Sequence, residues 1–154
     1  MKVKLTEIEL ATINIFSNIR TITARNNKVK DMKMTTANGT DIDRDGMIGE
    51  YAFCKLHNLF LEITASPRSG SYDCLWKGKR IDIKTTRHQS GRLLATLKQN
   101  PDVDVYVLAI LDGATVDFRG WCYYDELKQE CNKIDLGYGE GYALTQDKLR
   151  KFDV

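Results

Sequence analysis

The sequence lacks the segments that mark membrane and secreted proteins. No apolar run approaches the roughly 18 residues that a membrane-spanning helix needs. The opening residues, MKVKLTEIEL, have neither the long apolar region nor the small-residue cleavage site of a signal peptide. Internal repeats and low-complexity stretches are missing as well. We therefore expect a cytoplasmic protein that has no membrane partner.

Cysteine chemistry is also scarce. The four cysteines, at positions 54, 74, 122 and 131, form no Cys-x-x-Cys pair and fall in stretches that we predict to be helix or strand. Free thiols in a reducing compartment are therefore expected rather than a disulfide framework. A zinc site built from Cys122, Cys131 and one of the two histidines lacks the usual close spacing of zinc ligands.

What the sequence does contain is an ordinary globular composition with an uneven charge. Its 154 residues suit one domain with a real core, and 42% of them are hydrophobic. The net charge of +2 is the balance of +4 over residues 1–33, −3 over 34–67, +6 over 68–98 and −5 over 99–154. The +6 segment contains only two acids, Asp73 and Asp82. Such a segment is usually a solvated face, but the embedded acids also make it a candidate phosphate-binding surface with a metal site.

The first 45 residues are predicted to form a helix followed by a polar loop. Residues 5–22 carry a capping-box pattern in Thr6 and Glu9. The isoleucines at positions 8, 15, 19 and 22 fall on one face of this helix. Residues 23–45 are polar and rich in turn-forming residues, which favours a linker or loop.

The rest of the chain is predicted to be rich in strands. A helix is expected from about Gly46 to Phe60, followed by a turn at 66–71, strands at 72–76, 80–86, 91–96, 104–111 and 115–121, and a short helix at 123–131. The first two strands form a hairpin around Gly78. The stretch 104–111 is almost fully apolar, so we expect a central buried strand. The order predicts an α/β (α+β) fold, with a helix and polar linker over 1–43 and a core over 44–154 within a single globular domain.

The stretch DIDRDGMIGEYAF, which begins at Asp41, allows two interpretations. Its alternating aspartates followed by Gly46 match the first half of an EF-hand calcium loop. The twelfth position of that loop is Ala52, which cannot supply the bidentate carboxylate that calcium requires there. The alternative is a polar loop whose Asp45 caps a helix that carries Glu50. We favour the second interpretation.

Three carboxylates and a lysine are expected to converge around the hairpin. Asp82 and Lys84 are two apart on a strand, so their side chains point to the same side of the sheet. A short glycine turn brings Asp73 near that strand, and Glu50 lies on the preceding helix. Oxygen ligands of this kind suit Mg²⁺ or Mn²⁺. The plainer alternative is that Asp82 and Lys84 form a solvated pair on an edge strand.

The motifs GEYAF, YD, IDIKTT and DVYVLAI, in this order, resemble the PD-(D/E)xK nuclease superfamily, and more narrowly its small phage-encoded members. The likeness covers roughly residues 44–127. The family pattern is a helix glutamate, an aspartate on one strand and (D/E)-x-K on the next. Tyr72 stands where the family has its leading proline. The resemblance implies a restriction-endonuclease-like fold, which is a central mixed β-sheet flanked by helices, with an added N-terminal helix.

The resemblance also implies roles for particular residues. The helix glutamate maps onto Glu50, the first strand aspartate onto Asp73, and the (D/E)-x-K motif onto Asp82 and Lys84. Asp73, Asp82 and the backbone carbonyl of Ile83 would hold one Mg²⁺ or Mn²⁺ ion, and Glu50 would complete its sphere or hold a second ion. Lys84 would orient or deprotonate the attacking water.

The activity implied is metal-dependent hydrolysis of DNA phosphodiester bonds. The candidate contacts to the DNA backbone are Lys79, Arg80, Arg87 and Arg92. A homodimer is compatible with this activity, and a phage-encoded enzyme would work in the host cytoplasm. Two other functions stay open, namely an inactive DNA-binding relative of the same fold and a calcium-binding interaction protein.

Overall fold

A five-stranded mixed sheet forms the centre of the molecule. The computed structural model describes residues 1–26, 39–61 and 72–153. The strands are β1 (Lys2–Lys4), β2 (Cys74–Trp76), β3 (Lys79–Thr86), β4 (Leu93–Thr96), β5 (Val105–Asp112), β6 (Thr115–Tyr123), β7 (Lys133–Asp135) and β8 (Glu140–Leu144). The helices are α1 (Glu7–Asn26), α2 (Gly39–His57) and α3 (Tyr124–Leu127), with the 3-10 helices η1 (Glu130–Asn132) and η2 (Gln146–Lys148).

The order of the strands confirms the predicted central strand. The large sheet runs β1-β6-β5-β3-β2, so β5 lies in its middle. Strand β5 pairs in parallel with β3 and antiparallel with β6, while the outer pairs are antiparallel. Seven of the eight residues of β5 are buried. A strand that is covered on both faces needs apolar side chains on both faces, which explains its continuous apolar sequence.

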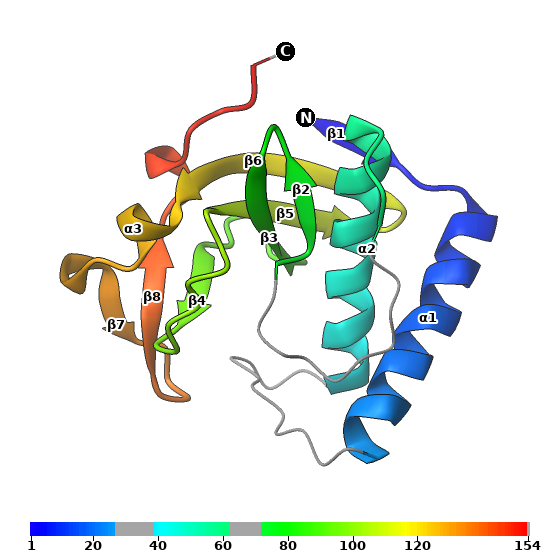
Figure 1. Cartoon of the computed structure of the whole chain (residues 1–154), viewed down its shortest axis with the longest axis horizontal. Helices are drawn as coiled ribbons and strands as arrows, with labels where there is room; N and C mark the ends of the chain where they lie inside the picture. Colours follow the sequence, from blue (N-terminus) through cyan, green and yellow to red (C-terminus); the bar gives the residue numbers. More distant parts are fainter. Residues whose placement is uncertain (27–38, 62–71, 154) are drawn as a thin grey trace.

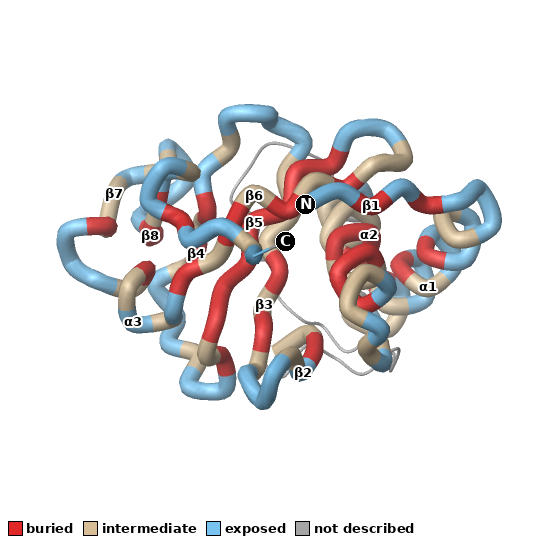
Figure 2. Tube along the Cα trace, turned by 90° about the horizontal axis from the view of Figure 1, so that it is seen from above, coloured by how far each residue is buried: buried red, intermediate tan, exposed pale blue. Residues whose placement is uncertain are grey.

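The large sheet is the middle of three layers. Figure 1 shows α1 and α2 beside one face of the sheet, and the smaller sheet β4-β8-β7 with α3 on the other side. The view from above in Figure 2 shows the same arrangement, with buried residues on both sides of β5. One core contains Phe53 of α2 and Val107 of β5, and a second contains Leu108 of β5 and Leu127 of α3. The described elements therefore confirm a mixed α/β fold.

The predicted hairpin is present. Strands β2 and β3 pair antiparallel, with Cys74 opposite Ile81. They are joined by Lys77 and Gly78, whose φ angles of 50° and 74° are both positive. Two residues with positive φ form the tight turn that matches the twist of a two-stranded hairpin, and glycine adopts this conformation without steric cost.

The N-terminal segment is part of the same fold. Strand β1, which the sequence analysis did not predict, pairs with β6 at the edge of the large sheet. The predicted helix is confirmed, but it begins at Glu7 and continues to Asn26, beyond the expected end at residue 22. Its capping box is also confirmed, since the Glu9 amide donates to Thr6 Oγ1 and the Thr6 amide to a Glu9 carboxylate oxygen.

Helix α2 begins seven residues earlier than predicted. It starts at Gly39 rather than Gly46, so residues expected in a linker or in a calcium loop are helical. The negative charges that suggested a loop are stabilised within the helix by neighbours. Arg44 pairs with Asp41 one turn away at 3.2 Å, Thr21 donates to Asp43 at 3.0 Å, and Arg87 pairs with Asp45 at 2.6 Å. The prediction that Asp45 caps the helix is therefore wrong.

The isoleucine face of α1 is exposed rather than buried. Helix α1 packs instead through Ile13, Ser17 and Thr21, which are buried against the rest of the protein. The partly buried Leu10 and Phe16 of α1 pack against the same core, so the helix has a second apolar face, and that face makes the contact.

The C-terminal part follows the prediction only in outline. The helix expected over 123–131 is divided into α3 and η1, and the tail contributes β7, β8 and η2. The turn predicted at 66–71, and most of the predicted loop between α1 and α2, lie outside the described residues. Among the helices in the described ranges, none combines the length and apolar character needed to cross a membrane.

Candidate functional site

The hairpin fixes Asp73 against strand β3. Asp73 lies directly before β2, and its backbone amide donates to the Ile81 carbonyl at 2.8 Å. Its side chain accepts a hydrogen bond from the Ile83 amide, with 2.7 Å between the nitrogen and Oδ2. The Asp73 carboxylate is therefore held at the residue that separates Asp82 from Lys84, as the sequence predicts.

Asp82 and Lys84 form an ion pair on strand β3. Lys84 Nζ lies 2.7 Å from Asp82 Oδ1 and 3.0 Å from Oδ2. The Asp82 side chain is only 13% exposed, whereas that of Lys84 is 41% exposed. In the parallel register Asp82 lies beside Tyr106 of β5, and Lys84 Nζ lies 5.8 Å from the centre of the Tyr106 ring. The pair is therefore half-buried beside a central strand and is not a solvated pair.

Glu50 is carried by α2, which packs closely on β3. A Cβ atom at Gly49 would lie 2.0 Å from Thr85 Oγ1, so only glycine permits this approach of helix and strand. The next residue, Glu50, is 12% exposed and accepts a hydrogen bond from Arg20 of α1, with 3.1 Å between Nη1 and Oε2. The sequence predicts the position of Glu50 but not its arginine partner.

The electrostatics place the three carboxylates near one another. Burial raises the pKa of Asp73 well above its ordinary value, and the negative charges of Glu50 and Asp82 raise it further. The positive charge of Lys84 and the hydrogen bond from the Ile83 amide lower the pKa of Asp73 by a smaller amount. Contacts on β3 join Asp73 to the Asp82–Lys84 ion pair through Ile83. Glu50 is linked to this cluster through the effect of its charge on Asp73.

The chemistry of this cluster fits a hard divalent cation. Its donors are carboxylate oxygens, which Mg²⁺ and Mn²⁺ prefer. The side chains are not gathered as a coordination sphere, because Glu50 turns toward Arg20 and Asp82 toward Lys84. Within the described part of the chain, no group of three or more His, Cys, Asp or Glu side chains is arranged to hold a metal ion. The metal ligands, including the Ile83 carbonyl, thus stay a prediction.

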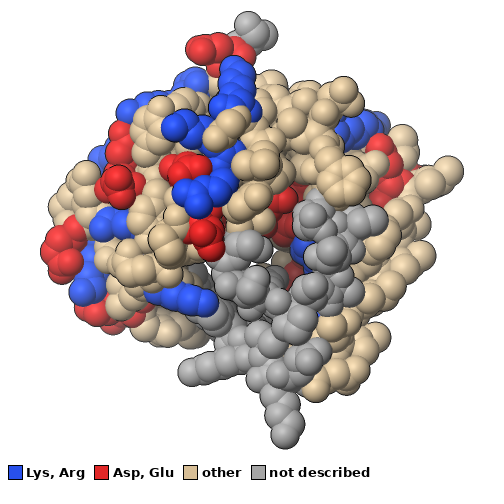
Figure 3. All heavy atoms as spheres, in the orientation of Figure 1, with Lys and Arg blue, Asp and Glu red and all other residues tan. Residues whose placement is uncertain are grey.

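The four predicted DNA contacts differ in their surroundings. Arg80 binds Asp104 through two hydrogen bonds, at 2.8 Å from Nη2 and 3.0 Å from Nε. Arg87 likewise contacts both oxygens of Asp45, at 2.6 and 2.7 Å. The other two residues, Lys79 and Arg92, are exposed. Figure 3 shows basic and acidic atoms intermixed on the visible face.

Two residues near the site were missed by the sequence analysis. Arg20, on α1, reaches Glu50 across 30 positions, and no local pattern signals such a contact. Lys128 follows α3 and donates to the carbonyls of Thr96 and Lys98 at 2.6 and 2.7 Å. Burial lowers the pKa of Lys128, and the charge of Lys84 lowers it further. Glu126 lies two positions before Lys128, but this spacing is too common in the sequence to be informative.

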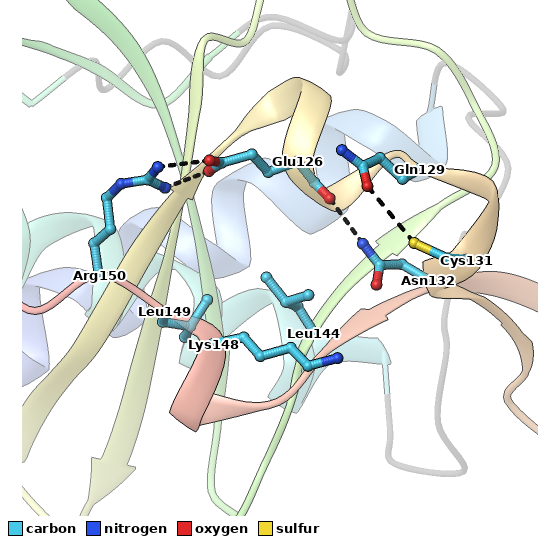
Figure 4. Close-up of a pocket in the computed structure, with 8 residues that line it drawn as sticks. All are labelled: Glu126, Gln129, Cys131, Asn132, Leu144, Lys148, Leu149 and Arg150. Carbon is cyan, nitrogen blue, oxygen red and sulfur yellow. Dashed lines mark hydrogen bonds and ion pairs between the residues drawn. The ribbon is translucent and has the colours of Figure 1, made fainter.

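A separate depression lies away from this cluster. It has a volume of about 540 Å³ and is lined by residues of α3, η1, β8 and the segment around η2. Figure 4 shows Arg150 pointing to Glu126, and Asn132 pointing to the backbone of α3. The Arg150 guanidinium binds both carboxylate oxygens of Glu126, with 2.6 Å between Nη2 and Oε1. Two of the charged side chains that line this depression, Arg150 and Glu126, are therefore paired with each other.

Comparisons with known proteins returned no match. No family model matches the chain, and neither a curated protein nor a solved structure matches it.

Proposed function

We propose that this chain is a metal-dependent deoxyribonuclease that hydrolyses phosphodiester bonds in DNA. The observation that carries the proposal is the 2.7 Å hydrogen bond from the Ile83 amide to Asp73. It holds the aspartate directly before one strand beside the Asp-x-Lys motif of the next, which is close to the arrangement that the resemblance to the PD-(D/E)xK superfamily implies. Two carboxylates that lie close together in a buried site are unfavourable unless nearby cations or hydrogen bonds offset their charge.

The architecture supports a restriction-endonuclease-like fold as part of the same proposal. A mixed sheet lies at the centre, the hairpin β2–β3 lies at one end of it, and α1 and α2 cover one face. The helix that carries Glu50 packs directly on the strand that carries Asp82 and Lys84. A helix with a glutamate (α2), a first strand (β2) and a second strand with the Asp-x-Lys motif (β3) thus follow in the order of the family pattern.

Each residue of the cluster has a distinct role in the proposed reaction. Asp73 and Asp82, with the Ile83 carbonyl, would hold one Mg²⁺ or Mn²⁺ ion, and Glu50 would complete the sphere. When bound, such an ion supplies positive charge next to the phosphate oxygens. Lys84 would orient the attacking water by donating a hydrogen bond to its oxygen, or, as the neutral amine, would accept its proton. The ion pair with Asp82 holds the ammonium group in place for the first of these roles.

The internal ion pairs are the first barrier that DNA hydrolysis must overcome. Glu50 is held by Arg20 and Asp82 by Lys84, so both contacts have to loosen before these carboxylates coordinate an ion. The same contacts favour a second candidate function, which is a DNA-binding relative that does not cleave. The calcium-binding alternative is not supported, because the residues of the expected loop lie within α2.

DNA would approach through the exposed cations Lys79, at the start of β3, and Arg92, just before β4. Lys79 and Arg92 carry charge that the described acidic side chains do not offset through a close ion pair, whereas Arg80 and Arg87 are already paired with aspartates. Phosphate contacts position the nucleic acid without specifying its sequence. We therefore assign the main electrostatic contacts to Lys79 and Arg92.

The proposal is tested by nicking of supercoiled plasmid in Mg²⁺, Mn²⁺, Ca²⁺ and EDTA. We expect nicking in Mg²⁺ or Mn²⁺, its loss in EDTA, and its loss when Asp73→Ala and Asp82→Ala are combined. Asp41→Ala is the matched control, because this carboxylate is exposed and pairs only one turn along its own helix. Binding without nicking in any ion supports the inactive relative. Nicking that survives the double substitution means that the site is elsewhere.

The preferred DNA structure needs a substrate panel. The same protein and ions are assayed on supercoiled plasmid, linear duplex, single strand, flap and four-way junction. Preference for a branched substrate by tenfold or more identifies a structure-selective enzyme, and equal rates identify a general nuclease. Both outcomes are compatible with the proposed chemistry, whereas cleavage of none of the five is not.

A further inference from the structure

Helix α1 exposes a row of isoleucines that no other part of the described chain covers. The exposed fractions are 79% for Ile8, 60% for Ile15, 44% for Ile19 and 58% for Ile22. Figure 1 shows why, since α2 lies between α1 and the sheet and the far side of α1 faces outward. The row presents on the order of 400 Å² of apolar surface, which is the size of the largest exposed patch on a typical monomer, and such a patch is often functional.

The opposite face of α1 already has its contacts. Ile13 and Ser17 are buried there. Thr21 donates to Asp43 of α2 at 3.0 Å, and Arg20 binds Glu50. The helix therefore cannot rotate to bury its isoleucines without breaking these polar contacts. The exposed row is a second functional face of the helix rather than a misplaced core.

The spacing of the row identifies its partner. Ile8, Ile15 and Ile22 are seven residues apart and are symmetric about Ile15. A seven-residue apolar repeat on an α-helix is the pattern of a helix that packs along a second helix. We propose that α1 forms a homodimer interface in which two copies of the helix pack antiparallel around a two-fold axis at Ile15.

This arrangement makes the row complementary to itself. Ile8 packs against Ile22 of the partner subunit, Ile15 packs against Ile15 of the partner subunit, and Ile19 lies over Ala11 of the partner subunit. A closed two-fold interface of this kind uses the same patch on both chains, so it leaves no apolar surface exposed. Antiparallel helices also place opposite ends of their dipoles together.

Other partners fit the row less well. The exposed positions between the isoleucines are Ala11, Thr12, Asn14 and Asn18, none of which is charged. A nucleic acid needs cations at the contact, and the row contains none. A membrane surface is bound by helices whose polar face is basic and solvated, whereas the exposed polar positions beside the row are uncharged. A second copy of the chain needs no charge and buries the whole row.

The test is the mass of the full chain in solution, measured by light scattering and sedimentation over a range of concentrations. We expect a species of twice the 17.6 kDa chain mass. Ile15→Lys places two like charges at the two-fold axis and should weaken dimerisation by at least roughly a hundredfold. Leu75→Lys is the matched control, since Leu75 of β2 is 53% exposed and lies outside the row. It should leave the mass unchanged.

A charge swap tests the orientation and guards against misfolding. Ile8→Glu or Ile22→Lys alone should weaken the dimer, and the two together in one chain should restore it, because the antiparallel pairing places each glutamate beside a lysine of the partner. Circular dichroism and melting should match those of the parent chain throughout, because all these side chains are exposed. A parent chain that is monomeric at every concentration overturns the proposal. A dimer that survives Ile15→Lys overturns it as well. A chain with both Ile8→Glu and Ile22→Lys that stays monomeric overturns the antiparallel arrangement.

Discussion

Replacing Lys84 with alanine separates the proposed chemistry from the stability of the fold. The Lys84 side chain is 41% exposed, and its one described ion pair, with Asp82, is 2.7 Å long. Partly exposed pairs of this kind contribute about 0.2–1 kcal/mol. For a chain of this size, a loss of about 1 kcal/mol lowers the melting temperature by about 2–4 °C, and a smaller loss lowers it proportionally less. The variant should therefore fold and remain available for kinetic measurement.

Turnover should fall far more than stability. Removing one preorganised charge from a site where negative charge develops costs a factor of about 10² to 10³ in rate. DNA affinity should change much less, because Lys84 is one of eight Lys and Arg residues in the segment 68–98. Metal binding should persist, since Asp73 and Asp82 both remain. The expected result is thus a loss of rate at nearly constant affinity.

The assay is single-turnover cleavage in Mg²⁺, with a parallel DNA-binding titration in Ca²⁺. Lys55→Ala is a matched control, because Lys55 is 39% exposed and pairs with Glu9 at 2.8 Å, almost as Lys84 pairs with Asp82. It should have a similar small effect on melting and none on cleavage. If Lys84→Ala cleaves within a few-fold of the parent chain, Lys84 is a structural strand residue, and the nuclease proposal loses its main support.

Three further predictions follow from individual contacts. Gly49→Ala should destabilise the fold by roughly 1–3 kcal/mol in urea unfolding, because its Cβ would lie 2.0 Å from a threonine oxygen of β3; Gly46→Ala, with nothing within 4 Å, should not. Hydrogen bonds from Lys55 of α2 and from the Thr6 backbone amide lower the pKa of Glu9 from about 4.5 to about 2. The ionised Glu9 therefore stabilises the fold above pH 4.5, and this stabilisation is lost as the pH falls toward 2. Glu9→Gln should therefore flatten the acid decline in melting temperature, and an unchanged decline would contradict this cause. Replacing Lys79 and Arg92 by alanine should reduce the slope of log affinity against log salt by about 2, and a salt-independent parent chain would refute electrostatic binding.

The elements that could be predicted from sequence are those with one dominant local cause. Strand β5 is apolar at nearly every position because it is covered on both faces, and its central place follows from that. The hairpin follows from a single glycine between two apolar stretches. The capping box of α1 follows from two residues three positions apart. In each case neighbouring residues contain the whole signal.

The start of α2 could not be predicted because its cause is not local. Three aspartates near the beginning of a segment favour a loop when they are considered alone. In the fold, Asp43 has a hydrogen-bond partner on α1 and Asp45 has an ion-pair partner after β3. Those partners are 22 and 42 positions away in the sequence. Asp41, in the first turn of α2, also lies where the helix dipole favours a negative charge.

The same limit applies to the candidate site. The positions of Asp73, Asp82 and Lys84 follow from strand periodicity and from one turn, and the structure brings them together as expected. The contact of Glu50 with Arg20 depends on how α1 packs on α2, which the periodicity of α1 indicated incorrectly. A pattern shows that a helix has two faces, but not which of the two faces the rest of the chain.

The partners of the site carboxylates determine how an ion could act on this protein. Glu50 is paired with Arg20 at 3.1 Å and Asp82 with Lys84 at 2.7 Å, while Asp73 accepts a backbone hydrogen bond. A structural zinc site holds a fold together through its ion, whereas the carboxylates of this cluster are already held by contacts within the chain. An ion would therefore stabilise the protein only by binding preferentially to its folded state. An ion that took Asp82 would also break the ion pair between this carboxylate and Lys84. Because one carboxylate serves both partners, coordination of an ion and the position of the Lys84 ammonium group are coupled. In the proposed reaction, the Asp82–Lys84 ion pair therefore couples the binding of the metal ion to the catalytic role of Lys84.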